Sequence, residues 1–177
     1  MRILLSDASV LLNLLAADCL IELGSENGWE IAVCDSVKDE VKKLRDPMTG
    51  KMVPVDLKPY FDAHQLRLLN IHSESEASIF VQMAQIVDDG EAMSIAIAAC
   101  QGTELAMDDK KAIRHVQTRF PTIPIWTTPD LLKLWVETSA VSTSNLQDAI
   151  HSIEGKARYF PPRNHKLAEW WYRAKGT

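Results

Sequence analysis

The chain has 177 residues, of which 46% are hydrophobic and 24% are charged, and its formal net charge is −5. This length fits one domain with a sizeable core, and the composition excludes fibrous and low-complexity classes. The negative charge opposes binding of a polyanion by the surface as a whole. No apolar run reaches the roughly 18 residues that a membrane span needs, so we predict a cytoplasmic protein with no membrane contact.

Short apolar runs alternate with helical patterns along the chain. The predicted strands are residues 2–5, 30–34, 65–71, 104–107 and 123–126. The predicted helices are residues 9–15, 18–23, 36–44, 57–64, 74–87, 91–99, 109–118, 129–138, 144–153 and 165–173. Alternating strands and helices form a parallel sheet that is covered on both faces. We therefore predict the α/β class, as a three-layer α/β/α sandwich with a central, mostly parallel five-stranded sheet.

Two local features carry further expectations. Ser36 is the expected N-cap of the helix 36–44, with Asp39 near the capping-box position. Residues 48–59 contain Gly50 and Pro54 and are expected to form an irregular excursion. The three cysteines, at positions 19, 34 and 100, lie far apart in apolar segments, which predicts buried free thiols in a reducing compartment.

Four acidic residues at the edges of predicted elements are the main functional signal. Asp7 and Asp108 directly follow predicted strands, and Glu40 and Glu91 lie near the starts of helices that follow a strand or a turn. In a parallel α/β sheet, the carboxyl ends of the strands and the adjacent helix starts gather along one edge. Carboxylates that converge there repel one another unless divalent cations hold them. The pattern therefore favours metal-dependent phosphodiester chemistry, for which Mg²⁺ or Mn²⁺ bound by oxygen ligands suffices.

Each acid also has a simpler structural interpretation. Asp7 and Asp108 are suitable N-caps for the helices that follow them. Glu40 is placed to pair with Lys42 or Lys43, and an acid in the first helical turn, such as Glu91, suits the helix dipole. The joint occurrence of the four acids is what favours a functional site over these separate roles.

Four segments of the chain resemble the signature blocks of PIN domains. They are residues 4–11 (LLSDASVL), 34–41 (CDSVKDEV), 89–96 (DGEAMSIA) and 105–112 (LAMDDKKA). The resemblance covers about residues 1–128. It implies a compact α/β/α nuclease domain, which we place at residues 1–140, followed by a helical extension with a basic, aromatic tail at residues 141–177.

The resemblance also implies roles for individual residues. Asp7, Glu40, Glu91 and Asp108 would be catalytic and would bind Mg²⁺ or Mn²⁺, with Asp109 as a further metal ligand. Ser9 would support the first acid or the metal. Many PIN domains are the ribonuclease toxins of toxin–antitoxin pairs, so the expected substrate is single-stranded or structured RNA and the expected partner is a small antitoxin protein. A homodimer is also expected.

Basic residues suggest two contacts with RNA. Lys110, Lys111 and Arg114 follow the last acid pair and are candidates for binding the RNA backbone, although a solvated helix face explains them as well. Residues 155–177 contain six basic residues and one acidic residue. The adjacent aromatics Trp170, Trp171 and Tyr172 are expected to pack on the chain's own core, with a dimer or antitoxin contact and base stacking as alternatives.

Two other functions remain open from the sequence. The first is a PIN-like scaffold that acts by protein–protein binding without catalysis. The second is a phosphatase with an aspartate nucleophile, which would place Asp-x-Asp after the first strand. The sequence at that point reads Asp7-Ala8-Ser9, so the phosphatase fits poorly.

Overall fold

The computed structural model describes residues 2–176. The first half of the described chain contains β1 (Arg2–Ser6), α1 (Ala8–Ala16), α2 (Leu20–Glu26), β2 (Trp29–Cys34), α3 (Asp35–Glu40), β3 (Lys43–Arg45), β4 (Met52–Pro54), α4 (Lys58–Asp62), β5 (Arg67–Leu69) and α5 (Glu74–Met83). The second half contains α6 (Asp89–Gln101), β6 (Glu104–Ala106), α7 (Lys110–Arg119), β7 (Ile125–Trp126), α8 (Thr128–Thr138), α9 (Thr143–Ser152), the π-helical turn η1 (Ile153–Ala157) and α10 (Ala168–Ala174).

The central sheet has five strands in the order β5-β2-β1-β6-β7, and all its strand pairs are parallel. From β1 the chain builds the sheet outward through β2 and β5, and it then returns to the other side of β1 to add β6 and β7. The direction of winding therefore reverses between β1 and β6. In open α/β sheets, ligands bind outside the carboxyl ends of the strands at this reversal.

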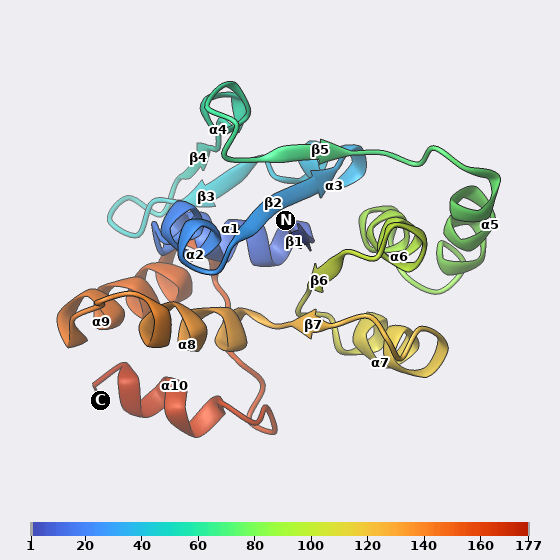
Figure 1. The fold of residues 1–177 in the computed structure, drawn as a ribbon. Helices are drawn as coiled ribbons and strands as arrows, with labels where there is room; N and C mark the ends of the chain where they lie inside the picture. The colour runs from blue at the N-terminus through green and yellow to red at the C-terminus, as the bar shows by residue number, and fades with distance from the viewer. Residues whose placement is uncertain (1, 177) are drawn as a thin grey trace.

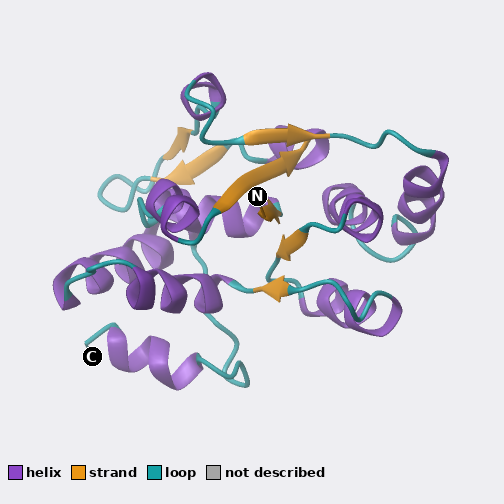
Figure 2. Ribbon diagram, viewed as in Figure 1, coloured by secondary structure: helices purple, strands orange, loops and turns teal. Residues whose placement is uncertain are grey.

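Helices cover both faces of the sheet, which confirms the predicted α/β/α fold. Figure 1 shows α5, α6 and α7 on one side of the strands and α2, α8 and α9 on the other. The middle strands are nearly continuous apolar runs, because both of their faces are buried; Leu4, Leu5 and Leu105 are 0% exposed. The alternation of strand and helix along the chain is visible in Figure 2.

The C-terminal region packs on the same core as the rest of the chain. Residues of α9, η1 and α10, including Leu146, Ile150, Ile153 and Trp171, belong to the single buried apolar cluster. The turn η1 contacts α1 and β3. Trp171 is fully buried, which confirms the expectation that part of the aromatic tail packs on the core, while Tyr172 is exposed.

The region between β2 and β5 differs from its prediction. The helix expected over residues 36–44 begins at Asp35 and ends at Glu40, and its N-cap is Cys34 rather than Ser36. Leu44 instead lies in β3, which pairs with β4 as an antiparallel hairpin. The segment predicted to be irregular therefore contains a strand. The hairpin is short and mostly exposed, so it lacks the apolar alternation by which strands are recognised.

Two smaller expectations can also be compared with the structure. Cys19 and Cys34 are buried free thiols as predicted, but Cys100 is exposed, because it lies near the C-terminal end of α6. Within residues 2–176, no single helix is long and apolar enough to cross a membrane. The consecutive helices α1 and α2 pass that test only together, and they are bent by 101° relative to each other.

Candidate active site

Asp7 lies at the junction of β1 and α1, beside the reversal point of the sheet. Its side chain is only 5% exposed. It caps α1, because its Oδ1 accepts a hydrogen bond from the backbone N–H of Val10 at 2.7 Å. The hydroxyl of Ser9 lies 3.2 Å from both carboxylate oxygens of Asp7. The buried carboxylate of Asp7 therefore both caps α1 and contacts the hydroxyl of Ser9.

Three of the four predicted acids line one small cavity. Asp7, Glu40 and Glu91 surround a space of about 120 Å³ together with Ala8, Ser9, Val37 and Asp88. These acids come from the ends of β1 and α3 and from the first turn of α6. Segments that are far apart in the sequence thus bring their carboxylates to one place.

Close backbone packing positions Glu40. A methyl group added at Gly90 would lie 2.7 Å from Oε1 and 3.0 Å from Oε2 of Glu40. The carboxylate of Glu40 therefore rests against the first turn of α6, in space that only a glycine leaves free. Although the residue as a whole is exposed, its carboxylate faces Glu91's helix rather than pairing with Lys42 or Lys43, and the ion pairs of residues 2–176 do not include it.

The carboxylates of this cavity resist ionisation. Burial, and next the charge of Asp108, raise the pKa of Asp7 to about 8. Burial and the charges of Asp88 and Asp109 raise the pKa of Glu91 to about 7. Burial, followed by Asp88 and Asp89, also raises the pKa of Glu40. Burial is the main cause of each raised pKa and neighbouring carboxylates add to it, so a cation bound in the cavity would favour the ionised forms.

Asp108 lies next to this cavity, at the end of β6, and it is held by a separate set of donors. Its Oδ1 accepts hydrogen bonds from the backbone N–H of Thr128 at 2.9 Å and the hydroxyl of Tyr159 at 3.1 Å. Its Oδ2 accepts from the hydroxyl of Thr128 at 2.6 Å and from Nδ2 of Asn13 at 3.3 Å. Burial raises the pKa of Asp108, and these hydrogen bonds oppose the shift. Asp108 affects the cavity through its charge on Asp7, and it does not line the cavity itself.

Asp108 and Asp109 have different roles. Asp109, not Asp108, caps α7, because its Oδ1 accepts from the N–H groups of Lys111 and Ala112, both at 2.8 Å. The interpretation of Asp108 as the cap of this helix is therefore wrong. The side chain of Asp109 does not line the cavity, although its charge contributes to the raised pKa of Glu91.

The predicted basic residues lie on α7, beyond the acids. Lys110 Nζ donates to Oδ1 of Asn164 at 2.8 Å, and Lys111 Nζ donates to the carbonyl oxygen of Ile86 at 2.5 Å. Lys110 and Arg114 line a larger groove that shares no residue with the cavity, whereas Lys111 lines neither.

Several site residues were not predicted. Asp88 lines the cavity and caps α6 through the N–H of Glu91, and the Asp-Asp-Gly turn was its only signal. Asn13 is a buried polar residue on an apolar helix, which is a recognisable sign of a polar partner. Tyr159 is separated from Asp108 by 51 residues and lies outside the segments that resemble PIN domains, so nothing local identified it.

The donor set fits a hard divalent cation. Carboxylate oxygens are the ligands that Mg²⁺ and Mn²⁺ prefer, and Asp7, Glu40 and Glu91 present them around a space of suitable size. Within the described chain, no three Asp, Glu, His or Cys side chains stand close enough to hold an ion as they are placed. Coordination by this set therefore requires these side chains to move closer to one another.

A parallel sheet with clustered carboxylates beside its reversal point defines an α/β protein with an acidic cavity at the carboxyl ends of its strands. A family model described as "DUF3368: PIN domain" matches residues 3–165, so the chain belongs to the PIN-domain family. This confirms the resemblance and extends it past residue 128, through η1 and Tyr159. Comparison with curated proteins and with solved structures found no match. PIN domains are generally nucleases, which agrees with an acidic site at this position.

Proposed function

We propose that the protein is a divalent-metal-dependent endoribonuclease that hydrolyses phosphodiester bonds of single-stranded or structured RNA. The observation that supports this most is the convergence of Asp7, Glu40 and Glu91 on one cavity, where burial and neighbouring carboxylates raise their pKa values. Asp7, Glu40 and Glu91 would hold Mg²⁺ or Mn²⁺, with Asp108 and Asp109 adding negative charge beside them.

The chain's own residues have distinct parts in this proposal. A bound divalent ion supplies a more acidic water and neutralises charge on the phosphate. Glu91 lies in the first turn of α6 and would supply one of the ligand oxygens. Ser9 fixes the orientation of Asp7, and Thr128 and Tyr159 fix Asp108. Because the pKa values of Asp7 and Glu91 are raised to about 8 and about 7, cation binding near neutral pH should release protons.

The proposal extends to partners and place of action. By analogy with PIN domains that act as toxins, we also propose a toxin role in the cytoplasm with RNA as the target. A small antitoxin protein would be the partner, and the assembly would be a homodimer. Growth arrest on expression of the wild-type chain, and its absence with Glu91→Gln, would support the toxin role.

One observation favours the scaffold alternative. The acids are not preassembled within residues 2–176 into a group that could hold an ion without rearrangement. If no divalent cation binds, a role in protein–protein binding is the better explanation of the fold.

RNA cleavage tests the proposed activity directly. We expect the wild-type protein to cut a fluorescent single-stranded RNA in the presence of Mn²⁺ and to leave it intact in EDTA. Glu91→Gln should lower the rate about 100-fold or more, equivalent to about 3 kcal/mol of transition-state stabilisation. Glu74→Gln changes an exposed acid in the first turn of the neighbouring helix α5 and should leave the rate unchanged. Equal rates for wild type and Glu91→Gln would reject the assignment.

A substitution at Gly90 tests whether Glu40 is a metal ligand. We expect Gly90→Ala to fold with unchanged or slightly higher stability, by up to about 1 kcal/mol, because alanine favours the helix. Its methyl group must move the carboxylate of Glu40, so Mn²⁺ affinity measured by calorimetry should fall about 10-fold or more. Gly155→Ala is the control, since its methyl group would meet only Cβ of Pro47 at 3.6 Å. Wild-type affinity in Gly90→Ala would remove Glu40 from the metal site.

A further inference from the structure

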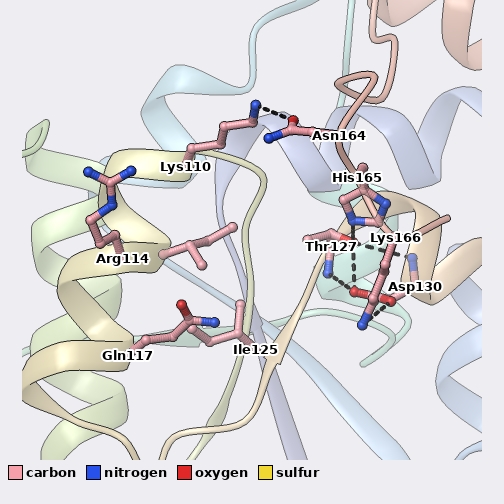
Figure 3. Close-up of a pocket in the computed structure, with 10 residues that line it drawn as sticks. Lys110, Arg114, Gln117, Ile125, Thr127, Asp130, Asn164, His165 and Lys166 are labelled. Atoms are coloured by element: carbon pink, nitrogen blue, oxygen red, sulfur yellow. Dashed lines mark hydrogen bonds and ion pairs between the residues drawn. The ribbon is translucent and has the colours of Figure 1, made fainter. Parts of the chain in front are cut away.

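A groove of about 480 Å³ lies between α7 and the segment that precedes α10. Figure 3 shows Lys110 and Arg114 on one wall and Asn164, His165 and Lys166 on the other. Its volume falls within the range of pockets that bind small organic ligands, and it is the size of site that a single nucleotide could fill. The groove shares no lining residue with the acidic cavity.

The charge of the groove suits a phosphate. Lys110, Arg114 and Lys166 face it, and Asp130 is the carboxylate among its lining residues. Lys166 pairs with Asp130 at 2.8 Å, whereas Lys110 binds the neutral amide of Asn164. Neither Lys110 nor Arg114 forms a salt bridge with any residue between positions 2 and 176. Two cations in a hollow without carboxylate partners are placed to bind an anion.

The rest of the lining suits a nucleobase. Ile113 and Ile125 are half-buried and give the groove an apolar surface. The amides of Gln117 and Asn164 supply donors and acceptors of the kind that bind base edges. An apolar surface with a few polar groups beside a cationic rim is the composition that a nucleotide unit of a single strand requires.

Hydrogen bonds hold the wall opposite α7 in place. The His165 Nδ1 accepts from the N–H of Leu167 at 3.1 Å, and Nε2 lies 3.0 Å from Oγ1 of Thr127. Thr127 donates its hydroxyl proton to Asp130 at 2.7 Å, so His165 is neutral and donates through Nε2. This chain of bonds ties the segment to the capping box of α8. A wall that is already ordered loses little entropy when a ligand binds.

The groove lies beside the acids along the same edge of the sheet. Lys110 follows Asp108 by two residues after β6, and Thr127 is adjacent to Thr128, which binds Asp108 after β7. Neighbouring strands are about 4.8 Å apart. A strand of nucleic acid that enters the acidic cavity at β1 would therefore reach the groove within a few strand widths.

We propose that this groove binds one nucleotide of the substrate strand next to the phosphate that is cut, with the phosphate on Lys110 and Arg114 and the base against Ile113 and Ile125. The proposal rests on the proposed RNA-cleaving function, since it names the second contact of the same substrate. It gives a role to residues 164–166, which lie far in sequence from the four acids.

Binding of an uncleavable RNA tests the groove separately from catalysis. Fluorescence anisotropy would follow a 2′-O-methyl decamer on the full chain in EDTA. We expect Arg114→Ala to raise Kd about 10-fold or more and to reduce the slope of log K against log salt by about 0.7, which is one phosphate contact on a single strand. Gln117→Ala should weaken binding with no change in that slope.

Arg119→Ala is the matched control. Arg119 lies at the end of the same helix but outside the groove, so its loss should change Kd by less than about 2-fold. If Arg114→Ala and Arg119→Ala weaken RNA binding equally, or if Arg114→Ala keeps wild-type affinity, the proposal that the groove binds a nucleotide is wrong. If the wild-type protein cleaves RNA and Arg114→Ala does not change RNA binding, only the proposal for the groove is rejected. The expected binding pattern without Mn²⁺-dependent cleavage would reject the catalytic proposal alone. Thermal unfolding of each variant confirms that the exposed substitutions leave the fold intact.

Discussion

Asp7→Asn should abolish RNA cleavage and, in metal-free buffer at pH 9, should stabilise the protein. The carboxyl group of Asp7 is buried beside Asp108, and its pKa is raised to about 8. Asparagine keeps the shape of the side chain and is an equally good N-cap, so the bond from the N–H of Val10 to the cap is retained. What the substitution removes is a buried negative charge that has no cation to balance it.

The sign of the pH effect follows from the raised pKa. In the unfolded chain Asp7 loses its proton near pH 4, whereas the folded protein keeps it until about pH 8. Its contribution to stability is therefore fully present below pH 4 and is lost as the pH rises through 8. Glu91, with a pKa raised to about 7, adds in the same direction. We expect the free energy of unfolding of the metal-free protein to fall with pH across this window, by an amount on the order of a few kcal/mol.

Chemical unfolding from pH 5 to pH 9, in EDTA and in Mn²⁺, measures this effect. Asp7→Asn should show a shallower fall in EDTA, and Mn²⁺ should stabilise wild type most at high pH and the variant hardly at all. Asp46→Asn is the control, because the N–H of Met48 lowers the pKa of Asp46, so its removal should not stabilise the protein at any pH. If stability of the wild-type protein rises from pH 5 to pH 9 in EDTA, the buried-charge explanation is wrong.

The sequence was sufficient to predict the central sheet and most of the acids that line the cavity. The strands before Asp7 and Asp108 are short, largely apolar and buried on both faces. They could therefore be recognised in the sequence, together with the acid that follows each of them. Glu91 followed a clear turn and opened an alanine-rich helix. These signals are local, and parallel topology then forces the chain segments to a common edge.

What the sequence could not supply depends on contacts between distant segments. The pairing of β3 with β4 buries little apolar surface. The residues around Leu44 therefore lack the alternation of apolar and polar side chains that predicts a strand. Asp109 rather than Asp108 caps α7, because the carboxylate of Asp108 accepts hydrogen bonds from Thr128 at the start of α8. The groove required the segment at 164–166 to return beside α7, and no periodicity in the sequence indicates that return.

The C-terminal region is linked to Asp108 by a short series of contacts. Trp171 donates from Nε1 to Oε1 of Glu154 at 3.1 Å. Its ring meets Tyr159 edge-on, with centroids 5.9 Å apart and planes at 71°, and Tyr159 donates to Asp108. Lys175 pairs with the other oxygen of Glu154 at 2.6 Å. The tail therefore supports the orientation of Asp108, which lies beside the acidic cavity.

Trp171→Ala should destabilise the protein by about 3–5 kcal/mol, as expected for removing a fully buried aromatic side chain, and should lower Tm by roughly 10 °C. Tyr172→Ala changes the adjacent, exposed aromatic and should lower Tm by no more than about 2 °C. Tyr159→Phe keeps the ring against Trp171 and removes only the donor to Asp108, so it should cost about 1 kcal/mol while lowering the rate of RNA cleavage. A stable Trp171→Ala protein would mean that α10 is not part of the core. Unchanged cleavage in Tyr159→Phe would mean that the tail supports the fold without influencing the acids.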